Sequence, residues 1–290
     1  MSHTDQVRAT GEATLAGAPP VTAGPADPAD RAIDAADRAA DRRERLVRVT
    51  GQVGVGVVFL VAWQLLSGPV ANPFFISEPA AILERLVELT RSGELWQHLS
   101  TTMTETGLGL AVGLPLGVVV GVAVALSRTV GPWFYPYIIA LYSLPRVALA
   151  PLFIVWFGLG LGSKVVMVVT MVVFVVFYNV YQGVKDIDED LLAMARSYRA
   201  GRGHVLRWII LPAISTWLLT ALRLAIGLGL IGAVIAELVG SSEGLGFYIK
   251  DSSNALDTTG VFAGLVVITV VAMLFEQLIA AVERRVLRHR

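Results

Sequence analysis

The chain has 290 residues, 55% of them hydrophobic and 16% charged, with 23 basic and 23 acidic side chains and no cysteine. Its mean hydropathy is +0.67, and a soluble domain of this size has about 25% charged residues, so the composition indicates a membrane protein. Disulfides, thiolate metal sites and cysteine nucleophiles are excluded, and the zero net charge gives no bulk attraction to nucleic acid.

The N-terminal stretch differs from the rest of the chain. Residues 1–48 are rich in Ala, Pro, Asp and Arg and contain no apolar run. We expect a largely disordered tail, with residues 1–29 fully so. Residues 30–48 are either a solvated tail or a polar helix supported by the i,i+4 pairs Asp34–Arg38 and Asp41–Arg45.

Apolar segments long enough to cross a bilayer fill most of residues 49–290. Because lipid offers the backbone no hydrogen bonds, they must be helices or a closed barrel, and continuous apolar runs exclude the alternation of a barrel. The predicted fold is an all-α membrane protein with six transmembrane helices, at 49–67, 105–127, 132–157, 165–184, 213–239 and 261–282.

The basic residues predict the orientation. With a cytoplasmic N-terminus, sixteen Lys and Arg residues near the spans lie inside and four lie outside. The positive-inside rule therefore predicts that both termini are cytoplasmic.

Two outer connections and one inner connection are long. Residues 78–91 place Ile82, Leu83, Leu86, Val87 and Leu89 on one helical face, which predicts an interfacial helix on the outer leaflet. Residues 240–260 are polar and rich in Gly and Ser.

The inner connection, residues 185–212, is the most informative. Acidic residues at its start favour a helix N-terminus, and Leu191, Leu192, Ala195 and Tyr198 follow at helical spacing. The apolar face of such a helix packs either on the chain's own helices or on a partner protein.

This connection resembles the loop of ABC importer permeases, whose pattern is Glu-Ala-Ala, three residues, Gly, nine residues and Ile-x-Leu-Pro. In this chain Ile209-Ile210-Leu211-Pro212 matches in full, whereas Ala193, Met194 and Arg199 replace the Glu, the first Ala and the Gly. Other stretches resemble the nitrate, sulfonate and taurine branch: Ala148-Leu149-Ala150-Pro151-Leu152, Trp156-Phe157-Gly158-Leu159-Gly160, Ala221-Leu222-Arg223-Leu224-Ala225, Ala236-Glu237-Leu238-Val239-Gly240 and Gly244-Leu245-Gly246.

The resemblance implies a five-helix importer-permease core plus an additional N-terminal helix. It implies a bacterial inner-membrane protein that pairs with a second copy of itself, with two ATPase subunits and with an extracytoplasmic solute-binding protein. The implied ATPase-coupling loop comprises Leu191, Leu192, Ala193, Met194, Ala195, Arg196, Ser197, Tyr198, Arg199, Ala200, Ile209, Leu211 and Pro212.

The implied function is import of a small solute such as a sulfonate, taurine or nitrate, without catalysis, cofactor or metal in this chain. A neutral heterocyclic vitamin precursor is the alternative substrate. Residues 158–164 lack the Gly-Lys pair of a phosphate-binding loop, so ATP hydrolysis is expected on a separate subunit. A secondary transporter is the competing class, although no internal repeat supports it; an intramembrane enzyme would need a nucleophile or metal pair at depth.

Small and charged residues inside the spans complete the predictions. Gly109, Gly113, Gly117 and Gly121 lie four apart and predict close helix packing. Charges at bilayer depth cost at least about 2.5 kcal/mol and need a reason. We hypothesise that Arg223 pairs with Glu276, or that both face water separately, and that Arg146 faces the solute pathway; Glu237 is a further intramembrane charge.

Overall fold

We describe residues 28–67, 75–127 and 129–287 of a computed structural model. The chain divides into two compact units, Met1–Ala62 and Trp63–Arg290, whose boundary falls within the first described helix. That helix, α2 (Pro28–Leu66), contains an apolar stretch at Leu46–Leu66 long enough to span a membrane. Residues 28–48 belong to this helix, which agrees with the polar-helix alternative for residues 30–48, and an Ala-rich sequence readily extends a helix that the span has nucleated. The predicted disorder of residues 1–27 lies outside the described residues.

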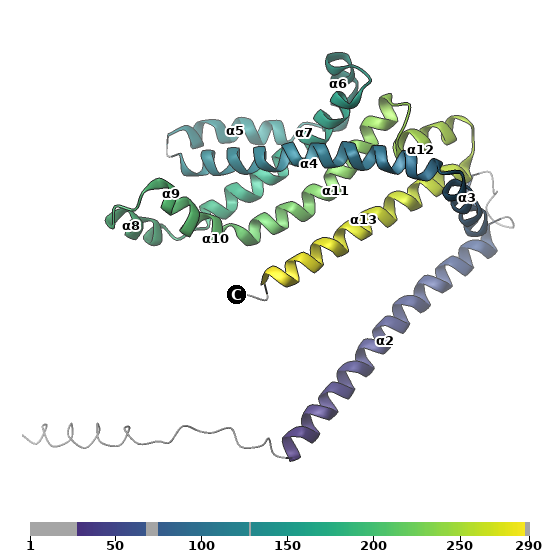
Figure 1. The fold of residues 1–290 in the computed structure, drawn as a ribbon, viewed down its shortest axis with the longest axis horizontal. Coiled ribbons are helices and arrows are strands. Elements are labelled where there is room, and N and C mark those ends of the chain that lie inside the picture. Colours follow the sequence, from purple (N-terminus) through teal and green to yellow (C-terminus); the bar gives the residue numbers. More distant parts are fainter. Residues whose placement is uncertain (1–27, 68–74, 128, 288–290) are drawn as a thin grey trace, which may run out of the picture. The chain divides into compact units, whose positions relative to one another are not determined.

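The second unit contains the remaining helices, whose order along the chain can be followed in Figure 1. They are α3 (Pro79–Ser92), α4 (Glu94–Leu126), α5 (Val130–Tyr142), the 3-10 helix η1 (Arg146–Leu149), α6 (Ala150–Phe157), α7 (Leu161–Lys185), α8 (Glu189–Ser197), α9 (Arg202–Val205), the π-helix η2 (Leu206–Ile210), α10 (Leu211–Ala213), α11 (Ser215–Gly240), α12 (Leu245–Asn254) and α13 (Thr258–Leu287).

Five described helices are long and apolar enough to span a membrane, and a sixth span requires a broken pair. The span predicted over 132–157 is not one straight helix: Gly131–Tyr142 and Arg146–Phe157 meet at 81°. Pro145 explains the break, since proline lacks a backbone N–H and disfavours the helical conformation of Leu144 before it. In contrast, α4 continues through Pro115.

The core forms around α7, which lies between α4 and α11 (Figure 1). The four glycines of α4 each meet one valine of α7, in the pairs Gly109 with Val168, Gly113 with Val172, Gly117 with Val176 and Gly121 with Val180. A Cβ added at any of the four would lie 3.0 Å or less from a valine carbon. The helix backbones therefore approach closely along a seam that only glycine permits.

The segments outside the spans gather at opposite ends of this unit. Helices α3 and α12 lie at one end, beside the start of α13, and α8 to α10 lie at the other (Figure 1). Helix α3 forms as predicted, but Ile82 and Leu89 on its apolar face are buried against Tyr248 and Ala263 of the chain itself. Only part of that face, including Leu83, is free to meet lipid.

Candidate coupling loop, intramembrane charges and outer surface

Residues 185–212 fold into short helices with identifiable end signals. Asp188 caps α8, because its Oδ1 accepts a hydrogen bond from the Asp190 backbone N–H at 2.8 Å. Further along, the Leu211 N–H donates to the Leu206 carbonyl, five residues back, in π-helical η2. This widening adjoins Pro212, which has no N–H to donate to the carbonyl four residues before it.

The apolar residues of α8 divide between two faces. Leu192 and Ala195 face the protein: Ala195 is 8% exposed, and Leu192 packs on the core cluster that contains Ile210 and Ile214. Leu191, Met194 and Tyr198, at positions i, i+3 and i+7, are 40%, 54% and 80% exposed. We call these three residues the exposed stripe of α8. The sequence pattern predicted the apolar residues but could not separate the covered from the open face.

Helix α8 ends at a residue in a left-handed conformation. Arg199 has φ 51°, and the Ala200 N–H donates to the Ala195 carbonyl at 3.0 Å, as in a helix-terminating turn. Glycine adopts this conformation without strain. Arg199 occupies the Gly position of the importer pattern, and its backbone is therefore strained where glycine would not be.

The other predicted loop residues take ordinary positions around these features. Ala193 is exposed and its carbonyl accepts from the Ser197 hydroxyl, Ile209 packs on the core cluster, and Leu211 is exposed. Arg196 lies in α8, Ala200 follows the turn, and Pro212 lies in α10.

Glu237 is fully buried near the C-terminal end of α11, where it joins α4 to the segment that leads into α12. Its Oε1 accepts from the Thr102 hydroxyl at 2.7 Å and its Oε2 from the Gly246 N–H at 2.6 Å. Thr102 Oγ1 in turn accepts from the Leu245 N–H at 2.9 Å, and His98 Nδ1 from the Gly244 N–H at 3.2 Å. We call these residues the Glu237 network.

The network explains two of the sequence stretches that resemble the importer branch. A Cβ at Gly244, whose φ is 106°, would lie 2.3 Å from the Glu237 carboxyl carbon, and one at Gly246 would lie 2.5 Å from the Val234 carbonyl oxygen. The Gly-Leu-Gly turn therefore presents its backbone donors to the carboxyl group of Glu237 at a distance that side chains would prevent. Glu237 acts as a structural pin in this structure and faces no open path.

A second buried pair lies next to the network. Lys164 at the start of α7 contacts Glu105 of α4, with 3.2 Å between Nζ and Oε1, and both side chains are at most 9% exposed. The sequence prediction places Lys164 among the four basic residues outside the membrane and assigns it no partner. The only signal was a lysine at the edge of an apolar span, which does not identify the acid opposite it.

Arg223 does not pair with Glu276. It forms an ion pair with Glu283, two helical turns further along α13, and Glu276 has no ion-pair partner among the described residues. The pair is partly exposed on both sides, so its contribution to stability is small.

Arg146 lies at the break of the bent span. Its Nη2 donates to the Tyr142 carbonyl at 2.7 Å, and its guanidinium carbon lies 4.9 Å from the ring centres of both Tyr142 and Phe174. Two aromatic faces and a carbonyl thus hold the guanidinium in one place.

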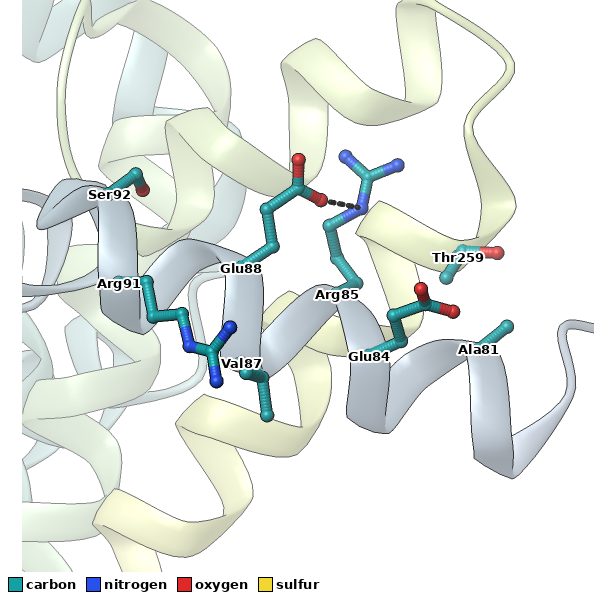
Figure 2. A pocket seen from close by; sticks show the side chains of 8 residues that line it. All are labelled: Ala81, Glu84, Arg85, Val87, Glu88, Arg91, Ser92 and Thr259. Carbon is teal, nitrogen blue, oxygen red and sulfur yellow. Dashed lines mark ion pairs between the residues drawn. The ribbon is translucent and has the colours of Figure 1, made fainter.

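A hollow of about 730 Å³ opens beside α3, and Figure 2 shows the side chains that line it. Glu84, Arg85, Glu88 and Arg91 line it together with Thr259 of α13. Arg85 pairs with Glu88 at 3.6 Å and with Asp257 at 3.1 Å. The surface is a mixed-charge platform held by a helix whose opposite face is buried. Close by, burial raises the pKa of the Tyr248 hydroxyl above its usual range.

A bundle of apolar helices with a broken span, and a connection between spans that carries an exposed apolar stripe, is the architecture of a polytopic membrane protein. The family described as "Binding-protein-dependent transport system inner membrane component" matches residues 113–288. The chain belongs to this family.

Individual relatives agree with this assignment. The chain is 33% identical to the taurine transport system permease protein TauC of Escherichia coli over 82% of this chain and 89% of that protein. It is 32% identical to SsuC of Bacillus subtilis, named for aliphatic sulfonate transport, over 80% and 85%. It is 28% identical to the formylaminopyrimidine transport permease protein ThiX of Halalkalibacterium halodurans, over 75% and 87%.

Among solved structures, a bacterial ABC transporter involved in the import of the acidic polysaccharide alginate shares the fold. The TM-score is 0.59 at 14% identity, with 86% of this chain and 99% of that chain covered. By its family and its relatives, the chain is a multi-pass membrane permease subunit of an ABC importer and is not itself an enzyme: ATP is hydrolysed by a separate subunit, and a binding protein is the second kind of partner.

Proposed function

We propose that this permease imports a small oxyanionic nutrient, such as a sulfonate or taurine, and that the exposed stripe of α8 is its docking surface for the ATPase. The relatives named for taurine and sulfonate transport support the substrate class. The observation that carries the docking assignment is the exposure of Met194 and Tyr198 on a helix whose other face is anchored in the core.

The physical reason is the cost of leaving this stripe in water. Leu191, Met194 and Tyr198 form one apolar surface outside the spans, next to the strained turn at Arg199. Aromatic side chains that enter a pocket on a partner are frequent sources of binding energy. Because Leu192 and Ala195 pack α8 against the rest of the permease, a displacement of the stripe by the ATPase moves α7 and α11 as well.

The complete assembly in this proposal has two copies of the chain, two ATPase subunits and one binding protein. Two-fold pairing is the commonest symmetry of homo-oligomers. Both termini are cytoplasmic, as the sixteen-to-four distribution of basic residues indicates. The α3 platform is then on the outer side, where its mixed charges suit a soluble binding protein.

The docking assignment is tested with the double variant Met194→Ala/Tyr198→Ala. We expect its affinity for the importer's ATPase subunit in detergent to fall about tenfold or more, with unchanged membrane insertion. Tyr137→Ala is the matched control, since Tyr137 is a 72% exposed tyrosine on α5, far from the loop in sequence. ATPase binding by the double variant at wild-type affinity would refute the assignment. Ala195 is a poor test position, because a substitution there disturbs the chain's own packing.

A neutral heterocyclic precursor is the second candidate substrate, and the likeness to ThiX, named for formylaminopyrimidine transport, favours it. Uptake into vesicles that contain permease, ATPase and binding protein separates the candidates. We expect accumulation of labelled taurine and none of labelled formylaminopyrimidine. The reverse result would replace the oxyanion with the heterocycle.

A further inference from the structure

We infer that Arg146, held at the break between α5 and η1, is the residue that binds the negatively charged group of a small oxyanion as it crosses the membrane. This inference rests on the proposed function, and it adds a specific binding residue within the permease.

The first observation is the position of the break. Residues 143–145 separate two helical halves, Gly131–Tyr142 and Arg146–Phe157, which meet at 81°. Arg146 therefore lies midway along a span that is apolar on both sides. Irregular backbone at membrane depth is stable only where protein buries it or where it lines a water-filled cavity.

The second observation is the exposure of the break. Ser143 and Pro145 are exposed, and Leu144 and Val147 are 47% and 53% exposed. The protein does not bury this backbone within the single chain. A water-filled path along the break satisfies the backbone carbonyls and hydrates the arginine at the same time.

The third observation is the charge. Each described ion pair joins other side chains, and none includes Arg146. The Arg146 Nε is buried and has no hydrogen-bond partner among the described residues. Arg223 in α11 and Lys164 in α7 also lie on apolar spans, and both have acidic partners. Arg146 is thus the one of these three whose charge is left for a ligand.

The fourth observation is how the guanidinium is held. Its hydrogen bond to the Tyr142 carbonyl uses Nη2, and the rings of Tyr142 and Phe174 hold its carbon at 4.9 Å. Tyr142 also stacks on Tyr178, with ring centres 6.2 Å apart. The remaining N–H groups keep the fork geometry that matches a sulfonate or a carboxylate. Because the rings and the carbonyl position the guanidinium but do not neutralise it, as a carboxylate would, its charge remains available to the solute.

The test uses the natural absence of cysteine from this chain. In vesicles with ATPase and binding protein, Arg146→Gln should lower the uptake rate of taurine about tenfold or more at low taurine concentration. ATPase association and ATP hydrolysis stimulated by the binding protein should remain. Arg223→Gln, which removes an arginine that already has an acidic partner, should keep the wild-type dependence of uptake on taurine concentration.

The charge itself is tested with Arg146→Cys. Modification by aminoethyl methanethiosulfonate restores a positive charge and should restore part of the uptake, whereas methyl methanethiosulfonate, which adds no charge, should not. Unchanged uptake by Arg146→Gln, or equal rescue by both reagents, would overturn the inference. Loss of ATPase association in every chain, including the wild type, would instead refute the proposed function.

Discussion

The glycine seam between α4 and α7 makes a quantitative prediction for Gly109→Ala. The new Cβ would lie 2.3 Å from both Cβ and Cγ1 of Val168. Nonbonded carbons rest about 3.5–4.0 Å apart, so the contact is too short by roughly 1.2 Å. Val168 cannot yield by rotation, because its Cβ is fixed by the backbone. Helix α7 has little room to move away, because α11 packs closely against it: a Cβ at Gly232 would lie only 3.3 Å from the Val168 Cα.

The energetic balance follows from two opposing effects. Overpacking of this kind costs about 1–3 kcal/mol, while alanine improves helix propensity over glycine by up to about 1 kcal/mol. We expect a net loss of about 1–2 kcal/mol and a drop in Tm of about 2–8 °C. The change in Tm is measured by thermal unfolding of the purified protein in detergent, monitored by circular dichroism.

Gly107→Ala is the control, since it lies in the same helix and a Cβ there meets nothing within 4 Å. That variant should be as stable as the wild type or slightly more stable. Equal Tm values for the two variants would show that the helices adjust freely and that the seam does not fix their distance. In addition, Gly109→Ala combined with Val168→Gly should lose less stability than the sum of the single changes.

Two further predictions concern the ends of the bundle. Arg199→Gly should stabilise the protein by up to about 1 kcal/mol, because glycine adopts the left-handed conformation of this residue without strain. The control Ala200→Gly should destabilise the protein. If thermal unfolding shows a stability change of the same sign for both variants, the assignment of the turn is contradicted. Glu237→Ala should destabilise by about 2 kcal/mol or more, since two buried donors lose their acceptor, whereas Glu243→Ala, on the exposed side, should stay within about 0.5 kcal/mol. Limited proteolysis of residues 241–257 should accelerate only in Glu237→Ala, and equal cleavage of both variants would refute the pinning role.

The spans could be predicted from sequence because their signal is local. A run of about 20 apolar residues can satisfy its backbone in lipid only as a helix, whatever surrounds it. The break at 143–145 could not be predicted with the same certainty, because Pro115 and Pro145 look alike in sequence. Pro115 lies inside a continuous helix, whereas Pro145 lies at the break between two helices.

The outer end was the least predictable part. Residues 240–260 appear as a polar loop, yet they contain α12, with Leu245 and Tyr248 buried. Next to these residues, the Gly246 N–H donates a hydrogen bond to Glu237, a contact between two different elements that sequence alone does not reveal. Likewise, the apolar pattern of α8 located a helix, but only packing shows that Ala195 is covered and Tyr198 is open.

The two ends of the permease are joined by α7 and α11. Helix α11 begins beside residues 185–212, at Ile214 in the core cluster, and ends at the Glu237 network. Helix α7 runs between the same ends, from Lys164 to Lys185, and the glycine seam fixes its register against α4. Close-packed helices with one permitted register move as rigid bodies rather than deform. We therefore expect a displacement of α8 to reach the outer turn at Gly244 as a movement of whole helices, with the broken span, which packs less tightly, as the part that adapts.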